Sequence, residues 1–393
     1  MNKRVYLLAI VSFVVGMVEL IIGGLLDLVA NDLDVSLGQA GFLMTAFSLS
    51  FAIAAPILLT VTQRVDRKQL TLISLAVFLL GNVIAVFSPN YSILLVGRII
   101  SAASGSLLIA LCLTIVPAIV DEKYRTRAIS VVFMGVSGSL VLGIPIGLML
   151  GNSFGWRAPF VLISILTLVS MAGVYFFLGK IPPKPAVPIG VQLKTLKNRR
   201  ILLAQLTSII FLAGHLTFYG YLTPFLKMKM GMDGQWVSIV YLVFGIAAVV
   251  GGGIGGLLAD RFGTKTTILS VTALFALSMF MIPFTTFSLP IFLMILGVYS
   301  LLSWAITPPM QSYLIEISAG ASDIQQTLNN SAVHIGIALG SLIGGLVIEQ
   351  TSSVDLNPIA GGIFVLFAFG TAFFSMGKGS RKPYLQKEAM KID

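Results

Sequence analysis

Two acidic residues stand in an apolar stretch near the start of the chain. Glu19 lies near the middle of residues 5–30, and Asp27 lies near the far end of the same stretch. If the stretch crosses a membrane, a charged Glu19 is costly, and its side chain is too short to reach either interface. Glu19 must then face the protein interior, be protonated or be paired, which makes it a candidate proton carrier. We expect Asp27 to be a solvated acid at the membrane interface.

Arg98 and His215 are two further titratable residues within apolar stretches. An arginine does not deprotonate, so Arg98 would act by setting the ionisation of a neighbouring carboxylate such as Glu19. Its long side chain can instead reach the interface, or pair with Glu19 for purely structural reasons. His215 is either a proton-coupling group or a buried imidazole whose donor and acceptor are both satisfied. The sequence leaves these alternatives open.

The elements that must position these residues are membrane-spanning helices. Apolar residues make up 57% of the chain and charged residues 10%, whereas a soluble domain carries about 25% charged residues. The apolar runs are continuous over about 20 residues, the length of a spanning helix, and do not alternate as barrel strands do. The sequence therefore predicts an all-α membrane protein. Twelve spans are expected near residues 5–29, 38–62, 70–88, 91–119, 127–152, 157–178, 201–226, 236–258, 267–286, 289–315, 325–349 and 358–377.

A polar stretch rich in proline and lysine, residues 179–200, divides the spans into two sets of six. We expect an N-terminal half over residues 1–178 and a C-terminal half with a short tail over residues 201–393. Most basic residues fall in loops on one side of the predicted bundle, which by the positive-inside rule places both termini in the cytoplasm. The positive net charge is then a topology signal, and it gives no reason to expect a nucleic-acid partner.

The two halves repeat. Residues 59–68 align with residues 256–265, each following the second span of its half. The same offset brings His215 next to the position of Glu19, so both first spans carry a titratable group at similar depth. Two pseudo-symmetric six-helix halves are typical of transporters whose substrate site lies between the halves near the midplane.

The sharpest local motif is "GLLADRFGTK", residues 256–265. It resembles the cytoplasmic-loop signature of the major facilitator superfamily, in which acidic and basic residues pair across the cytoplasmic face and latch one conformation. The resemblance implies the major facilitator fold. It also implies a latch whose residues are Asp260, Arg261 and Lys265, together with Arg64 and Arg67 of the degenerate first-half copy.

The fifth predicted span carries a glycine–proline pattern, "GVSGSLVLGIPIGLMLG". Gly143 and Gly147 form a stripe of small residues that permits close helix contact, and Pro145 removes a backbone donor and is expected to kink the helix. The pattern resembles the signature of drug:proton antiporters in the same superfamily. Arg98 in the fourth span matches the arginine that is associated with proton transfer in those antiporters.

Over nearly its whole length the chain resembles a twelve-span drug:proton antiporter. Residues 18–36, 212–226 and 312–345 look more narrowly like bacterial purine base and nucleoside efflux pumps. This resemblance implies proton-coupled export of purine bases or nucleosides by alternating access.

The resemblance also implies roles for individual residues. Proton coupling would fall to Glu19, Arg98 and His215. Planar bases would be held by aromatic stacking and by hydrogen bonds to their edges. The candidate substrate-binding residues are Glu19, His215, Tyr219, Trp304, Gln311, Gln326, Asn330 and His334.

The sequence excludes several other function classes. It contains no Gly-x(4)-Gly-Lys-[Ser/Thr] phosphate loop, so transport would be driven by a gradient. It has no cluster of metal ligands, so no metal and no cofactor is expected, and enzyme functions fit poorly. The single cysteine, Cys112, is expected to be a buried apolar residue. The expected partners are a small-molecule substrate, protons and the lipid of a bacterial cell membrane, with the chain acting as a monomer.

Two other functions stay open. One is a multidrug or sugar efflux antiporter of the same superfamily, and the other is a membrane receptor or scaffold that transports nothing. The direction of transport is not encoded in any single residue, because the same acid can couple a proton to uptake or to export.

Overall fold

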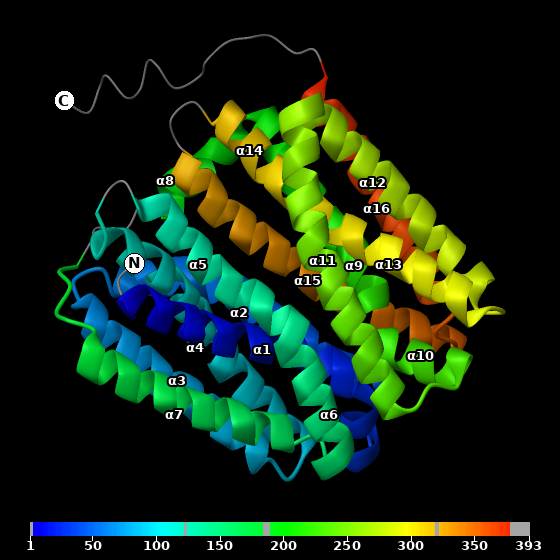
Figure 1. Cartoon of the computed structure of the whole chain (residues 1–393), viewed down its shortest axis with the longest axis horizontal. Helices are drawn as coiled ribbons and strands as arrows, with labels where there is room; N and C mark the ends of the chain where they lie inside the picture. The colour runs from blue at the N-terminus through cyan, green and yellow to red at the C-terminus, as the bar shows by residue number, and fades with distance from the viewer. Residues whose placement is uncertain (1–2, 122–123, 184–188, 319–321, 378–393) are drawn as a thin grey trace.

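The computed structural model describes residues 3–121, 124–183, 189–318 and 322–377, and every regular element within these ranges is a helix (Figure 1). Twelve helical segments of this part of the chain are long and apolar enough to cross a membrane. Each overlaps one predicted span, so the predicted all-α membrane fold is confirmed.

The helices fall into two sets. The first set is α1 (Lys3–Asp32), α2 (Leu37–Val61), α3 (Arg67–Val86), α4 (Tyr91–Ile115), α5 (Arg125–Gly138), α6 (Ile144–Phe154) and α7 (Ala158–Phe177). The second set is α9 (Arg199–Tyr219), α10 (Leu222–Met230), α11 (Gly234–Phe262), α12 (Thr264–Met281), α13 (Leu289–Ala305), α14 (Thr307–Ile317), α15 (Ser322–Thr351) and α16 (Leu356–Met376). Between them lie the short helix α8 (Ile189–Lys194) and the 3-10 turn η4 (Thr195–Lys197), both within the predicted linker.

Figure 1 shows the two sets as two bundles that lie side by side, the first coloured blue to green and the second green to red. Across the boundary α2 packs against α15, α1 packs against α10, and α6 packs against α11. Because successive spans alternate in direction, Lys3 and Met376 end on the same side of the membrane as α8. We call this side the linker side and the other the far side.

Three spans are each built from two α-helices. The fifth changes to a π-helical turn over Ser139–Gly143, immediately before α6. Pro145, in the first turn of α6, lacks the N–H that would continue the α-helical pattern. The tenth span breaks at Ile306, before a helix that starts with prolines, and the seventh breaks at Gly220 and Tyr221. Interruptions of this kind are tolerated in a membrane where the protein surrounds them.

Glycines bring neighbouring helices into close contact in both halves. In the first half, side chains at Gly143 and Gly147 would collide with Met17 and Ile21 of α1. The structure thus places the predicted small-residue stripe directly against the helix that carries Glu19. In the second half Gly340, the repeat partner of Gly143, packs in the same way against the backbone of α9. The shared packing follows from the internal repeat.

Helix α3 begins on the linker side within the first copy of the repeated motif, and an acidic residue of that copy caps it. Asp66 caps α3, where its carboxylate accepts hydrogen bonds from the backbone N–H groups of Lys68 and Gln69 at 3.0 and 3.1 Å. The same carboxylate accepts from the N–H of Ile181 at 3.1 Å. In the second copy the matching position is Gly263, whose φ of +83° suits a glycine.

Candidate functional site

Glu19 meets His334 across the boundary between the two halves. Glu19 belongs to α1 and His334 to α15, and the imidazole Nδ1 lies 3.3 Å from Oε1 of the carboxylate. Both side chains are largely enclosed, with 16% of Glu19 and 6% of His334 exposed. The His334 ring also lies against Phe51 of α2, with ring centroids 4.0 Å apart. A carboxylate and an imidazole from opposite halves therefore lie within ion-pair distance, and they form an ion pair if the imidazole is protonated.

Arg98 lies behind Glu19 in the first half. Its side chain is fully buried, and its guanidinium donates hydrogen bonds to the backbone oxygens of Val18 at 2.8 Å and of Glu19 at 3.4 Å. The guanidinium also stacks over the ring of Phe47, 4.1 Å from its centroid. The alternative in which Arg98 reaches the membrane interface is therefore wrong. Its positive charge lies against the same turn of α1 that carries the Glu19 carboxylate.

His215 lies elsewhere, inside an aromatic cluster of the second half. Its Nδ1 is 2.7 Å from the hydroxyl of Tyr299, which also donates to the backbone oxygen of His215 at 3.2 Å. The ring stacks on Tyr219, with centroids 5.1 Å apart. The structure thus pairs Glu19 with His334, and it places His215 and Tyr219 in a packed core. A role of His215 in proton coupling stays a prediction.

Asn330 and Gln326 are exposed on α15 and precede His334 by one and two steps of four residues. This stripe lies between two occupied faces of the helix. One face packs its glycines on α9, and the other bonds to α2, where the Ser331 hydroxyl donates to the oxygen of Ala52 at 3.0 Å. The stripe is exposed on the linker side of His334, whose ring faces Glu19 of the first half.

Two other candidate residues belong to the second half and are not part of this stripe. Gln311 of α14 donates from Nε2 to Oδ1 of Asn329 at 3.0 Å, inside the second half. Trp304 is half-buried near the end of α13, packed against the hydrophobic core. Neither residue contacts Glu19 among the described interactions.

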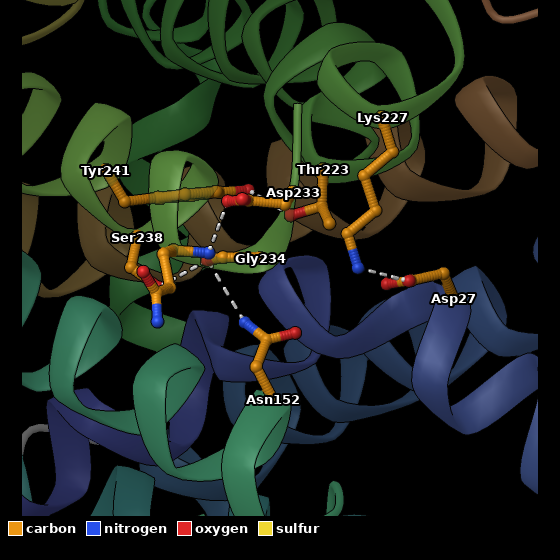
Figure 2. A network of polar contacts seen from close by, with 9 residues as sticks. Asp27, Asn152, Thr223, Lys227, Asp233, Gly234, Ser238 and Tyr241 are labelled. Atoms are coloured by element: carbon orange, nitrogen blue, oxygen red, sulfur yellow. Dashed lines mark hydrogen bonds and ion pairs between the residues drawn. The ribbon is translucent and has the colours of Figure 1, made fainter. Parts of the chain in front are cut away.

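On the far side the two halves are joined by polar contacts that the sequence did not indicate. Figure 2 shows Lys227 of α10 reaching Asp27 of α1, with Nζ and Oδ2 2.6 Å apart, and Asn152 of α6 donating to the backbone oxygen of Gly234 at 3.2 Å. The expectation that Asp27 is a solvated interfacial acid is therefore wrong, because it forms a half-buried ion pair between the halves. In the predicted topology Lys227 lies on the far side and is an exception to the positive-inside rule. That exception was the one sequence feature that could have indicated an acidic partner for Lys227.

A second far-side contact joins α2 and α15. The hydroxyl of Ser36 donates to Oε1 of Glu349 at 2.7 Å. Close by, Gly38 and Gly345 bring the two helices together, so that a side chain at Gly345 would lie 3.1 Å from the Cα atom of Gly38. Together with the Asp27–Lys227 pair, these contacts join the two halves on the far side of the boundary.

The predicted latch residues lie on the linker side. Asp260, Arg261 and Lys265 are not fully buried, and the Arg261 guanidinium lies over the ring of Phe262, 5.3 Å from its centroid. Arg64 is exposed and Arg67 is buried. Within the described ranges the structure has no ion pair at Asp260, so a latch made by these residues stays a prediction.

The described residues contain no group of three or more His, Cys, Asp and Glu side chains that could hold a metal ion. Cys112 is buried and free, packed within the first half.

Comparison with known proteins identifies the family. Residues 8–341 match the family model described as the Major Facilitator Superfamily. An uncharacterized MFS-type transporter of Bacillus subtilis (strain 168), YbcL, is 34% identical, and the alignment covers 93% of each chain. A chloramphenicol resistance protein of Streptomyces lividans is 27% identical, with 95% of this chain and 96% of the relative covered.

Among solved structures, a bacterial homologue of the human lysosomal transporter Spinster has the same fold. The TM-score is 0.80 at 14% sequence identity, and the match covers 95% of this chain and 96% of that chain. The family model, the relatives and the fold agree on a transport protein rather than an enzyme. The chain therefore belongs to the major facilitator superfamily of membrane transporters.

Proposed function

We propose that this protein is a proton-coupled exporter of purine bases or nucleosides that works by alternating access, with Glu19 as the proton carrier. The observation that supports this proposal most directly is the contact between Glu19 and His334, which joins the two halves next to the buried cation of Arg98. Proton coupling requires a titratable group whose surroundings change when the halves move, and a contact across their boundary has that property.

The mechanism follows from the charges. A deprotonated Glu19 attracts Arg98 and a protonated His334, whereas a protonated Glu19 attracts neither strongly. Protonation therefore changes the relative free energies of conformations that differ in the distance between Glu19 and His334. In the described conformation polar contacts join the halves on the far side, and the exposed Asn330 and Gln326 lie on the linker side. If that side is the cytoplasm, as the positive-inside rule predicts, substrate enters there for export.

Purine substrates are supported by the chemistry of these groups and by the resemblance of three stretches to purine efflux pumps. Carboxamides such as those of Asn330 and Gln326 both donate and accept hydrogen bonds, which matches the mixed edges of a nucleobase. The buried rings of Phe51 and His334 pack on each other at the inner end of the same stripe. Tyr219 lies in the aromatic core of the second half and is not available for stacking on substrate in this conformation.

Flux into everted membrane vesicles tests the proposal. With the interior made acidic, vesicles containing the protein should accumulate labelled hypoxanthine or adenine, and a protonophore should abolish the accumulation. Vesicles without the protein provide the control. Absence of proton-dependent purine accumulation would contradict the proposal.

Export of drugs is the second candidate, and the 27% identical chloramphenicol resistance protein favours it. It predicts proton-dependent accumulation of chloramphenicol or dyes in the same vesicles. In growth assays, expression would then protect cells against chloramphenicol rather than against purine analogues such as 2-fluoroadenine.

A further inference from the structure

A chain of hydrogen-bonded side-chain amides runs through the second half to the linker. Nε2 of Gln311 donates to Asn329 at 3.0 Å, and Nδ2 of Asn329 donates to Oε1 of Gln205 at 3.0 Å. Nε2 of Gln205 then donates to Oε1 of Gln325 at 3.3 Å, and Nε2 of Gln325 donates to the hydroxyl of Thr195 in η4 at 2.8 Å. Four amides therefore connect α14, through α15 and α9, with the linker.

The direction of this chain is fixed at its linker end, because backbone oxygens can only accept. The hydroxyl of Thr195 donates to the backbone oxygen of Gln192 at 2.7 Å, so it must accept from Gln325. Nε2 of Gln205 lies 3.3 Å from the backbone oxygen of Gln325 as well, so this end of the Gln205 amide must be its NH2 group.

The direction is also fixed in the middle. Nδ2 of Asn329 donates to the hydroxyl of Ser208 at 2.8 Å, and that hydroxyl donates in turn to the backbone oxygen of Ala204 at 3.5 Å. The Asn329 side chain therefore presents its oxygen to Gln311. Every amide in the chain donates towards the linker, and the carbonyl oxygen of Gln311 is left at the opposite end.

At the Gln311 end, the chain of amides terminates in a carbonyl oxygen that receives no hydrogen bond from the part of the protein that the structure describes. Oε1 of Gln311 is buried and has no hydrogen-bond partner among the described residues. Leaving a buried acceptor unpaired costs free energy, and such an atom in a native protein requires an explanation. The amides behind it strengthen it as an acceptor, because each hydrogen bond polarises the next group in a chain.

The depth of Gln311 in the membrane follows from its hydrogen bond to Asn329. Asn329 directly precedes the exposed Asn330 on α15 and lies five residues before His334, or about 7.5 Å along a helix axis. Gln311 thus lies on the linker side of the Glu19–His334 contact, at the depth of the exposed stripe. A solute that approaches Glu19 from the linker side would pass this level.

We propose that Oε1 of Gln311 accepts a hydrogen bond from an N–H group of the transported substrate, and that Asn329, Gln205 and Gln325 are positioning residues that hold Gln311 in that orientation. The purine identity of the substrate rests on the proposed function, whereas the requirement for an N–H donor does not. Purines that carry ring or exocyclic N–H groups fit this acceptor, and fully N-methylated purines do not.

Equilibrium binding to the purified full-length protein tests this proposal without a proton gradient. Labelled hypoxanthine is displaced by theophylline, which keeps one ring N–H, and by caffeine, which has none. The wild-type protein should bind theophylline more tightly than caffeine. Gln311→Met should weaken hypoxanthine binding about tenfold, the loss expected for one hydrogen bond, and should reduce the preference for theophylline over caffeine. Gln69→Met, at an exposed glutamine of α3, is the matched control and should behave as wild type.

A Gln311→Met protein that folds and keeps the full preference for theophylline would overturn the proposal. That result is also expected if a trapped water, rather than substrate, satisfies Gln311. If Gln311→Met does not fold, Thr195→Val provides the second variant, because it breaks the linker end of the chain without changing Gln311. Thr195→Val should reduce the same preference and Thr195→Ser should restore it, and an unchanged preference would again contradict the proposal.

Failure of the proposed function would look different. If the wild-type protein binds no purine, the substrate class is wrong, and the same comparison is made with chloramphenicol and its N-methylated amide. Loss of discrimination between these two compounds in Gln311→Met would support the acceptor role of Gln311, and retained discrimination would contradict it.

Discussion

Glu19 is an acidic side chain that two basic side chains from different helices approach. Arg98 of α4 bonds to the backbone oxygens of Val18 and Glu19, and His334 of α15 faces the carboxylate itself. Arg98 and Glu19 both belong to the first half, whereas His334 belongs to the second. The Glu19 carboxylate therefore has one basic neighbour in its own half and another in the opposite half.

Tyr299→Phe tests whether His215 is structural. The Tyr299 hydroxyl contacts Nδ1 of His215 at 2.7 Å and donates to its backbone oxygen. Its removal leaves buried polar atoms unpaired, which should lower the free energy of unfolding by about 1–3 kcal/mol. Thermal unfolding in detergent measures the loss, and Tyr6→Phe, at a tyrosine that is 52% exposed, is the control. If Tyr299→Phe abolished proton coupling without destabilising the protein, His215 would be a coupling group.

The sequence identifies Glu19 as an unusual buried acid, but it does not identify the residue that Glu19 contacts. An acid within an apolar run can be recognised from the sequence alone, whereas contact with His334 depends on how α15 packs against α1. The internal repeat pointed to His215, because it relates equivalent positions of equivalent helices. It carries no information about which side chains meet across the boundary. The ion pair of Asp27 with Lys227 was missed for the same reason.

At the scale of the helices, close packing through glycine positions the site. A stripe on the fifth span holds α1, and its repeat on α15 holds α9. A Cβ atom at Gly340 would collide with the backbone oxygen of Ala213, an obstacle that no side-chain rotation removes. The α9–α15 pair carries the amide chain and His334, so its spacing sets the geometry of the second-half part of the site.

Gly340→Ala should therefore destabilise the protein by about 1–3 kcal/mol, as expected for overpacking. Gly253→Ala on α11 is the matched control, because a Cβ atom there would meet nothing within 4 Å. Removing a helical glycine at that open position should leave stability unchanged or raise it by up to about 1 kcal/mol. Thermal unfolding of the two variants in the same detergent compares them. Equal stability of both variants would contradict the packing account.

The twelve spans were predictable, because the length and apolar character of a membrane helix are properties of a single segment. The interruptions within the spans were harder to predict from the sequence. Pro145 predicted a kink, and the structure has a π-helical turn over Ser139–Gly143 before it. The break at Gly220 and Tyr221 lay within a stretch expected to be one helix. There the Tyr221 hydroxyl donates to the backbone oxygen of Ser341 at 2.7 Å, a tertiary contact with no local signal.

At the scale of the whole molecule, alternating access requires the far-side contacts to separate in each transport cycle. The side chains of Ser36, at the start of α2, and of Glu349 on α15 are in contact across the boundary. Cysteines introduced at both positions should form a disulfide that holds the two halves together on the far side. Oxidation should abolish transport by the double variant, and reduction should restore it.

The native chain suits this experiment, because Cys112 is its single cysteine and is buried. Each single-cysteine variant serves as the control and should transport regardless of oxidation. A cross-linked double variant that transports at the full rate would show that the far side does not open in this way.

We propose that Glu19 couples movement of the two halves to the proton gradient. The most direct measurement compares two activities of Glu19→Gln in proteoliposomes: exchange of labelled substrate without a gradient, and accumulation driven by a pH gradient. Glu316→Gln, at an exposed glutamate of α14, is the matched control and should retain both. We predict that Glu19→Gln retains exchange and loses gradient-driven accumulation. Accumulation at the full rate by Glu19→Gln would contradict this account.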